Sequence, residues 1–474
     1  MFDDEEEDEG FDSQFNDELE RYEKMIAEKE TYYFDSETLE QIIDHFIIKN
    51  QLKKGLTAIE FAQQQHPNNT TFELRKAQIY STTGQLKESL LILQDLEKSE
   101  PFNTEVFVTK ASVFSQLRDH ENAIKYFEKA IDSAVDKEED WEVEDIRFDL
   151  ALEYESIHDY QNAIKELKKL LKNSPENESA IYEIAYCYER IGDFDKCIEY
   201  YTMYIENNPY SFTAWYNLGN IYFLKNNIEK ALWAYDYAVI INEDFSSAHF
   251  NMGNTYMQIN EFQKAIESYT KCLEIDGDDA LTLSYLAEAY ERLERYDEAL
   301  EYYEQSKAIN PEIAEPWLGI GIIKELQGFT ADAISYLNRA VEIQPENANY
   351  RLVLAEALYK SEMLLEAEAQ LETALQLDPK YSEAIILLAR IKAEFSIEEA
   401  IEFMASLEHL EDLESSVRVY FSILLWKNGQ KTDALLLFKK EYLIDANSAK
   451  TLFLHFPEAQ EIPEFIQILD LNND

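Results

Sequence analysis

The feature of this sequence that most limits its fold is a proline that returns every 34 residues. Seven of the ten prolines follow this spacing, in three groups: Pro67 and Pro101; Pro175 and Pro209; Pro311, Pro345 and Pro379. The gap from Pro209 to Pro311 is 102 residues, which is three periods. Because proline cannot continue a helix and disfavours helical geometry in the residue before it, a periodic proline predicts a periodic helix end. We therefore expect a tandem array of short helical repeats.

The stretch 212–245 shows what one repeat contains. Two sets of residues have the i, i+3, i+4, i+7 spacing of one helix face: Trp215, Leu218, Gly219 and Tyr222, then Ile228, Ala231, Leu232 and Tyr235. Asn226 and Asn227 stand between them as turn formers. The small Gly219 and Ala231 allow the helix backbones to approach closely, while the large Trp215 fills the space between pairs. A single pair has no core of its own, so each repeat must pack on the next.

The same pattern recurs along the chain. The small position of the second helix falls on Ala123, Ala163, Cys197, Ala231, Ala265, Ala299, Ala333 and Ala367. An aromatic residue or leucine follows four positions later, at Phe127, Leu167, Tyr201, Tyr235, Tyr269, Tyr303, Leu337 and Leu371. Repeats are expected to start near residues 36, 70, 104, 144, 178, 212, 246, 280, 314, 348, 382 and 415.

The run from Trp215 to Tyr222, followed by Ala231 and Tyr235, resembles the tetratricopeptide repeat family in its order of large, leucine, small, tyrosine, alanine and aromatic positions. The central repeats are similar to idealised members of that family and to the repeat domain of the O-linked N-acetylglucosamine transferases. The resemblance implies an all-α fold: a right-handed superhelical solenoid of stacked antiparallel helix pairs, with the first helix of each pair on the concave side.

Three regions follow from this pattern. Residues 1–35 are expected to form an acidic disordered tail and an N-terminal capping helix, residues 36–448 an array of about twelve repeats, and residues 449–474 C-terminal capping helices. The run Asp3 to Glu9 is entirely acidic and predicts disorder. Residues 138–143 are an insertion that contains Trp141, and the repeat near Phe395 is one residue short.

Two apolar faces predict the capping helices. The N-terminal face consists of Phe15, Leu19, Tyr22 and Ile26. At the other end, Pro463 suits the first turn of a helix, whose apolar face consists of Phe465, Ile468 and Leu469.

Composition excludes several functions. The net charge is −53, with 95 acidic and 42 basic residues, so nucleic acid and anionic membrane surfaces are disfavoured as partners. An RNA-binding helical repeat protein is the less favoured alternative for that reason. The chain has no apolar run of about 18 residues and an acidic N-terminus, so membrane insertion is not expected and a cytoplasmic location is. Cys187, Cys197 and Cys272 are expected to be small buried residues.

No arrangement of residues predicts catalysis, a metal or a cofactor. The seven histidines have no paired metal spacing, and the sequence contains no Gly-rich phosphate loop or nucleophile elbow. His249 takes the position that Trp215 has one repeat earlier, which favours a packing role. We therefore expect that the protein is not an enzyme.

A partner-binding site is predicted on the first helices of the central repeats. Its candidate residues are Tyr182, Glu183, Tyr186, Tyr216, Asn217, Asn220, Phe223, Phe250, Asn251, Asn254, Met257, Ser284, Tyr285 and Glu288. The asparagines can donate to and accept from a peptide backbone, the aromatic residues offer rigid apolar surfaces, and the glutamates, with Glu291, favour lysine or arginine in the ligand. The paired asparagines resemble the asparagine ladder of the O-linked N-acetylglucosamine transferases, although they are also the commonest choice in idealised repeats.

These observations predict a non-catalytic scaffold or adaptor that binds an extended or helical segment of a partner protein, with basic and apolar residues, in the concave groove. A co-chaperone or a substrate-recruiting subunit of a larger enzyme complex is the alternative. Binding of acidic chaperone tails is disfavoured, because the only basic candidates on this face, Arg190 and Arg292, stand beside glutamates.

Overall fold

The computed structural model of the chain describes residues 3–28, 30–136, 140–407, 413–444 and 462–470. These residues contain helices, turns and loops and no strand. The chain divides into two compact units, Met1–Tyr237 and Ala238–Asp474, which we call the N-terminal and the C-terminal unit. Helix α13 (Ile228–Ile241) begins in the first and ends in the second.

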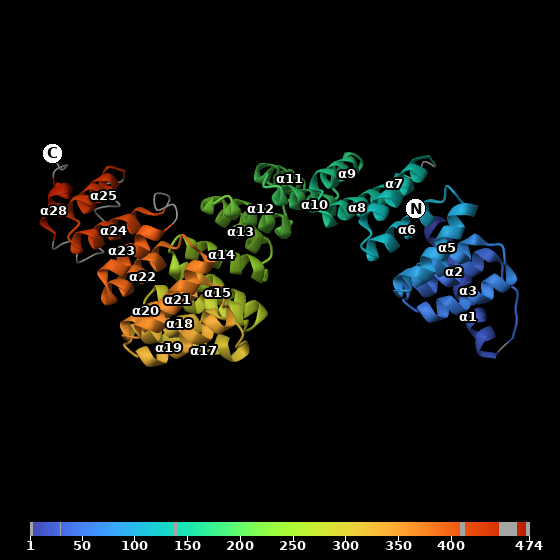
Figure 1. Cartoon of the computed structure of the whole chain (residues 1–474). Coiled ribbons are helices and arrows are strands. Elements are labelled where there is room, and N and C mark those ends of the chain that lie inside the picture. Colours follow the sequence, from blue (N-terminus) through green and yellow to red (C-terminus); the bar gives the residue numbers. More distant parts are fainter. Residues whose placement is uncertain (1–2, 29, 137–139, 408–412, 445–461, 471–474) are drawn as a thin grey trace. The chain divides into compact units, whose positions relative to one another are not determined.

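In the N-terminal unit, helix pairs follow one another along the chain (Figure 1). The helices are α1 (Asp3–Glu28), α2 (Ser36–Ile48), α3 (Leu52–Gln65), α4 (Thr70–Thr82), α5 (Leu86–Ser99), α6 (Thr104–Gln116), α7 (His120–Asp136), α8 (Asp140–Ser156), α9 (Tyr160–Asn173), α10 (Glu178–Arg190), α11 (Phe194–Asn207) and α12 (Phe212–Leu224).

The C-terminal unit continues the same alternation. Its helices are α14 (Ser246–Gln258), α15 (Phe262–Asp276), α16 (Ala280–Arg292), α17 (Tyr296–Ile309), α18 (Glu315–Leu326), α19 (Thr330–Ile343), α20 (Ala348–Lys360), α21 (Leu364–Leu377), α22 (Ser382–Phe395), α23 (Ile397–Ser406), α24 (Ser415–Lys427), α25 (Lys431–Ile444) and α28 (Pro463–Asp470). The all-α array of helix pairs is thus confirmed for the described residues.

The repeat starts predicted from the sequence agree closely with the helices. The first helices α2, α4, α6, α10, α12, α14, α16, α20, α22 and α24 begin at the predicted residue, and α18 begins one residue later. Helix α8 begins at Asp140 rather than near Glu144, so residues 140–143 of the predicted insertion form its first turn. The rest of the insertion lies outside the described residues.

At Pro101 and Pro175, the periodic proline marks the end of one pair, and an asparagine two positions later starts the next. The side chains of Asn103 and Asn177 accept hydrogen bonds from the backbone N–H groups of Val106 and Ala180, in the first turns of α6 and α10. Such caps satisfy amide groups that have no partner within the helix. The turn inside a pair uses a left-handed residue, as at Asn226, whose φ is 57°.

Glycine and tyrosine set the close packing within two central pairs. An added Cβ on Gly219 would lie 2.5 Å from the Tyr235 ring, and the Tyr269 ring fills the same space beside Gly253. The next pair has Ala287 at this position, and its tyrosine, Tyr303, shares one apolar cluster with Ala287 and also packs on Gly319 of α18. The ring position is therefore filled in all three pairs, but in the third pair the glycine under the ring belongs to the next first helix.

The terminal helices cover the ends of the array. On α1, Tyr22 and Met25 are buried, whereas Ile26 is 43% exposed, so the predicted apolar face is wrong at that position. Helix α1 begins at Asp3, and the disorder predicted for the acidic run stays a prediction. On α28, Phe465 is fully buried, and its ring stacks on Phe438 at 4.4 Å. The predicted residues 449–461 lie outside the described residues.

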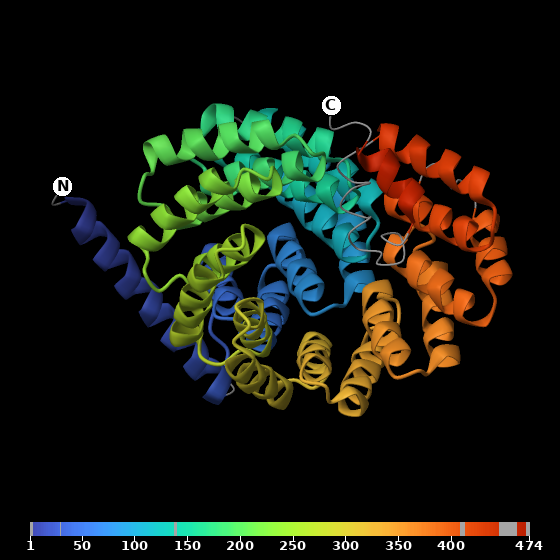
Figure 2. The same cartoon turned by 90° about the vertical axis from the view of Figure 1, so that its left-hand side faces the viewer.

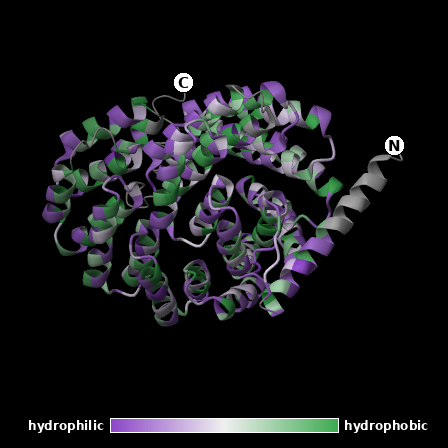
Figure 3. Cartoon of the chain, turned by 90° about the vertical axis from the view of Figure 1, so that its right-hand side faces the viewer, coloured by the Kyte–Doolittle hydropathy of each residue, from purple (hydrophilic) through white to green (hydrophobic). Residues whose placement is uncertain are grey.

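Some successive first helices contact one another directly in each unit. The contacts join α2 to α4 and α4 to α6 in the N-terminal unit, and α16 to α18, α18 to α20, α20 to α22 and α22 to α24 in the C-terminal unit. Figure 2 shows the helices of the C-terminal unit following one another from yellow-green through orange to red. Within the described chain, no contact of similar extent joins one second helix to the next. Hydrophobic and hydrophilic residues alternate along the helices, as expected of elements that pack on both neighbours (Figure 3).

Candidate functional site

All predicted site residues lie on first helices. Helix α10 carries Tyr182, Glu183 and Tyr186; α12 carries Tyr216, Asn217, Asn220 and Phe223; α14 carries Phe250, Asn251, Asn254 and Met257; α16 carries Ser284, Tyr285 and Glu288. We call these residues the first-helix wall of the unit to which they belong: α10 and α12 carry the wall of the N-terminal unit, and α14 and α16 that of the C-terminal unit. Tyr186 is exposed, Ser284 is buried and the others are half-buried. Ser284 was therefore wrongly expected to face a ligand.

In the N-terminal unit, Tyr182 connects two neighbouring pairs. Its hydroxyl lies 2.7 Å from the Thr213 hydroxyl, at the start of α12, and its ring packs on Tyr201 and Tyr204 with centroid distances of 5.8 and 5.9 Å. Tyr186 contacts the ring of Tyr160 edge to face at 6.4 Å. Tyr182 thus has a structural role in the stack, and Tyr186 offers the more accessible ring.

A pair of carboxyl groups lies beside these tyrosines. Burial, together with the nearby Glu183 carboxylate, raises the pKa of Glu155 on α8 to about 7. A hydrogen bond of 3.2 Å that Glu155 accepts from the Cys187 thiol acts in the opposite direction and lowers this pKa. Burial also raises the pKa of Glu183. A basic side chain placed between them would favour the charged forms of both carboxyls. Glu155 could not be predicted from the sequence, because its neighbour Glu183 is 28 residues away in the chain.

The asparagines of α12 differ in their surroundings. The side-chain oxygen of Asn220 accepts a hydrogen bond of 2.8 Å from the Tyr235 hydroxyl, so this amide fixes the ring that covers Gly219. The side chain of Asn217 has no hydrogen-bond partner among the described residues of the chain. Asn217 is therefore better suited than Asn220 to hydrogen-bond to a ligand.

The C-terminal unit repeats this arrangement on α14. The side-chain oxygen of Asn254 accepts a hydrogen bond of 2.7 Å from the Tyr269 hydroxyl. Phe250 packs on Tyr269 and, edge to face, on Tyr285, with centroid distances of 5.8 and 5.6 Å. Met257 packs in the same cluster. These residues form a continuous apolar and amide surface on α14 and α16.

The acidic residues of α16 already have partners. Glu288 accepts a hydrogen bond of 3.1 Å from the Arg292 guanidinium. Burial raises the pKa of Glu291, which accepts a hydrogen bond of 2.8 Å from the Tyr303 hydroxyl. Glu291 is therefore part of the packing between helices rather than an accessible group. In the N-terminal unit, the Arg190 guanidinium also has a partner, because it donates a hydrogen bond of 3.3 Å to the Tyr160 hydroxyl.

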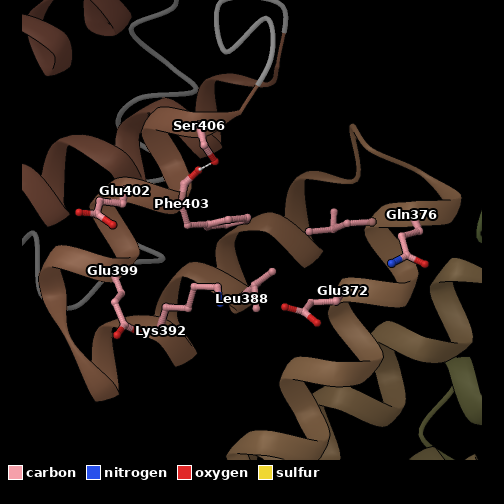
Figure 4. Close-up of a pocket in the computed structure, with 9 residues that line it drawn as sticks. Glu372, Gln376, Leu388, Lys392, Glu399, Glu402, Phe403 and Ser406 are labelled. Atoms are coloured by element: carbon pink, nitrogen blue, oxygen red, sulfur yellow. Dashed lines mark hydrogen bonds between the residues drawn. The ribbon is translucent and has the colours of Figure 1, made fainter.

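A separate groove lies between the second helices α21 and α23, on the C-terminal unit (Figure 4). Its volume is about 830 Å³, and its lining residues are Glu372, Leu375, Gln376, Leu388, Lys392, Glu399, Glu402, Phe403 and Ser406. Figure 4 shows Glu372 and Gln376 on one side, Phe403 on the other, and Leu388 between them. The only sequence signal near it is the short repeat at Phe395.

The described residues do not form a metal centre. No group of three or more histidine, cysteine or acidic side chains among them is arranged to hold a metal ion. His249 hydrogen-bonds through Nε2 to the Glu243 backbone oxygen at 3.1 Å, as the Trp215 indole does to Pro209 one repeat earlier, at 3.0 Å. The three cysteines are buried free thiols, as predicted.

Among the described residues, none of the helices is both long enough and apolar enough to span a membrane.

Comparison with known proteins agrees with this architecture. Models described as tetratricopeptide repeat or TPR repeat match residues 104–134, 158–218, 219–260, 244–312 and 326–391, which together exceed half of the chain. No curated protein matches the sequence.

The chain is also similar to several solved structures. MamA protein is 27% identical over 35% of this chain and 90% of its own, with a TM-score of 0.33. Yeast Tom70 is 17% identical over 85% of this chain and 98% of its own, with a TM-score of 0.44. Cut9, from the APC/C complex Cut9–Hcn1, is 13% identical over 88% and 95%, with a TM-score of 0.44.

Tandem helix pairs with a small residue and an aromatic residue at fixed positions define a helical repeat protein of the kind that binds other proteins. The chain belongs to the tetratricopeptide repeat family.

Proposed function

We propose that the protein is a non-catalytic scaffold or adaptor whose first-helix wall binds an extended or helical segment of a partner protein. The observation that carries this proposal is the combination of half-buried aromatic rings and amides on successive first helices with a net charge of −53. Such a surface offers apolar contacts and backbone hydrogen bonds while attracting cations. The partner segment is therefore basic and apolar.

The proposed concave position of the wall rests on contacts between first helices elsewhere in each unit. There, first helices such as α4 and α6, or α18 and α20, contact one another directly, whereas the second helices of the described chain have no contacts of similar extent. In a curved stack, the elements that lie closer together are on the inner side. A cytoplasmic location is supported by three buried cysteines that remain free thiols.

The partner can be isolated and then used to test the wall. The full chain is immobilised, bound proteins are eluted with salt and identified by mass spectrometry, and the strongest partner is measured by calorimetry. The dissociation constant is expected to rise with salt, because the attraction between opposite charges is screened. A dissociation constant that does not change with salt would contradict the charged part of the proposal.

Two variants test the residues directly. Asn217→Ala and Glu183→Gln remove a hydrogen-bonding group and a charge from the wall, and each is expected to weaken binding by about fivefold. Glu206→Gln is the matched control, because Glu206 is exposed on the second helix α11. Equal affinity of all three variants would contradict binding at the wall. Asn220 and Asn254 are unsuitable for this test, because each holds a tyrosine hydroxyl.

A further inference from the structure

We propose that the groove between α21 and α23 is a second docking site, which binds a basic amphipathic segment of a partner protein. It is distinct from the first-helix wall, because its lining residues lie on α21, α22 and α23, and none of these helices carries a residue of the wall. The site is formed wholly within the C-terminal unit.

The groove exists because one repeat departs from the regular frame. A single residue, Ser396, separates α22 from α23, whereas three residues, Ser361 to Met363, separate α20 from α21. Helix α23 has only 10 residues, while α21 has 14. The Ser396 hydroxyl accepts a hydrogen bond of 3.3 Å from the Glu399 backbone amide and so caps the short helix. Because α23 is short and follows a short turn, it leaves open the space that a longer second helix fills in the regular pairs.

The charge of the groove selects a cation. Glu372, Glu399 and Glu402 line it, all three are exposed, and none of them has an ion pair among the described residues. Lys392 is the basic residue of the lining, and its ammonium is paired with Glu368. The lining therefore has an excess of negative charge near the opening, which favours lysine or arginine in a ligand.

The floor of the groove selects an apolar group. Leu388 is buried, and Leu375 and Phe403 are half-buried beside it. The Lys392 ammonium lies 5.9 Å from the centre of the Phe403 ring. Carboxylates around an apolar floor fit a segment with basic residues on its edges and leucine-like residues on one face.

A model peptide tests the site in the full chain. The probe is a fluorescein-labelled 14-residue helical peptide of lysine and leucine, with the leucines on one face, measured by anisotropy in about 150 mM salt. Replacing Glu372, Glu399 and Glu402 together by glutamine is expected to weaken binding by about fivefold or more. The matched control replaces the exposed Glu267, Glu301 and Glu366, with the same change in charge, and is expected to alter affinity by less than about twofold.

Two further measurements locate the bound peptide. Ser406→Lys places a cation at the exposed rim and is expected to reduce binding of the lysine probe without loss of helical signal. A benzophenone on the probe is expected to cross-link to α21–α23. Equal losses in the groove and control variants, cross-links spread over both units, or self-association of the chain that competes with the probe would each overturn the proposal. Glu183→Gln leaves this binding unchanged if the two surfaces are independent, so failure of one proposal is distinguishable from failure of the other.

Discussion

At the scale of single residues, the close approach of the helices in the central pairs depends on the absence of a side chain. Gly219 lies under the Tyr235 ring, whose hydroxyl is fixed by Asn220. By contrast, the nearest atom to an added Cβ on Gly55 of α3 is the flexible end of Ile79, at 3.1 Å. Two helical glycines therefore differ in what an added methyl group would meet.

Gly219→Ala is expected to destabilise the protein by about 1–3 kcal/mol, because the ring has to leave its place. Gly55→Ala is the control: it is expected to be neutral or stabilising by up to about 1 kcal/mol, since alanine favours the helix. Urea unfolding followed by circular dichroism measures both. A similar loss of stability in both variants would contradict the role of the tyrosine ring.

The carboxyl group of Glu155 predicts a pH effect. Its folded-state pKa of about 7 lies above the ordinary value of 4.5, so the folded protein retains a proton that the unfolded chain releases. The free energy of unfolding is therefore expected to fall as pH rises from about 4.5 to about 7 and to level off above.

Glu155→Gln removes that dependence, and it is expected to stabilise the protein by about 1–2 kcal/mol at pH 8, allowing for solvent screening, with little effect at pH 4.5. Urea unfolding at the two pH values measures the difference. Stabilisation of equal size at both pH values would show that the Glu155 carboxyl does not titrate between pH 4.5 and pH 8.

At the scale of elements, most helix starts could be predicted because they are encoded locally by a proline and by a capping residue such as Asn103 or Asn177. Side-chain direction could not be predicted in the same way. The Tyr269 ring packs on Gly253 of its own pair, whereas Tyr303, at the same repeat position, also packs on Gly319 of the next first helix. The groove at α23 could not be predicted from the sequence either, because a shortened repeat does not indicate which residues it exposes.

The end helix α28 gives the prediction at this scale. Phe465 packs on Phe438 at 4.4 Å and on Trp426 at 5.6 Å. Phe465→Ala is expected to cost about 3–5 kcal/mol of local stability, as for other buried phenylalanines. Hydrogen exchange is expected to accelerate in α24 and α25 while remaining unchanged in α14 and α15, because each pair is stabilised mainly by its neighbours. Gln467→Ala, at an exposed position of α28, serves as the control.

At the scale of the whole molecule, charge and packing act in opposite directions. The first 35 residues have 15 acidic and three basic side chains, so most of the net charge of −53 belongs to the array itself. Ion pairs such as that of Arg75 with Asp44, at 2.6 Å, offset part of the repulsion. With 95 acidic and 42 basic residues, however, one-to-one pairing would leave more than half of the acidic groups without a basic partner.

Salt is therefore expected to have opposite effects on stability and on binding. Raising sodium chloride from about 20 mM to about 300 mM screens the repulsion among carboxylates, so the thermal midpoint of the free chain should rise. The same change screens the attraction to a basic partner, so its dissociation constant should rise too. Repeating the titration with potassium chloride separates general screening from binding of a particular cation, because screening depends on ionic strength alone. A midpoint that falls with salt would mean that the ion pairs outweigh the repulsion, and the electrostatic attraction inferred for both binding surfaces would then lose its basis.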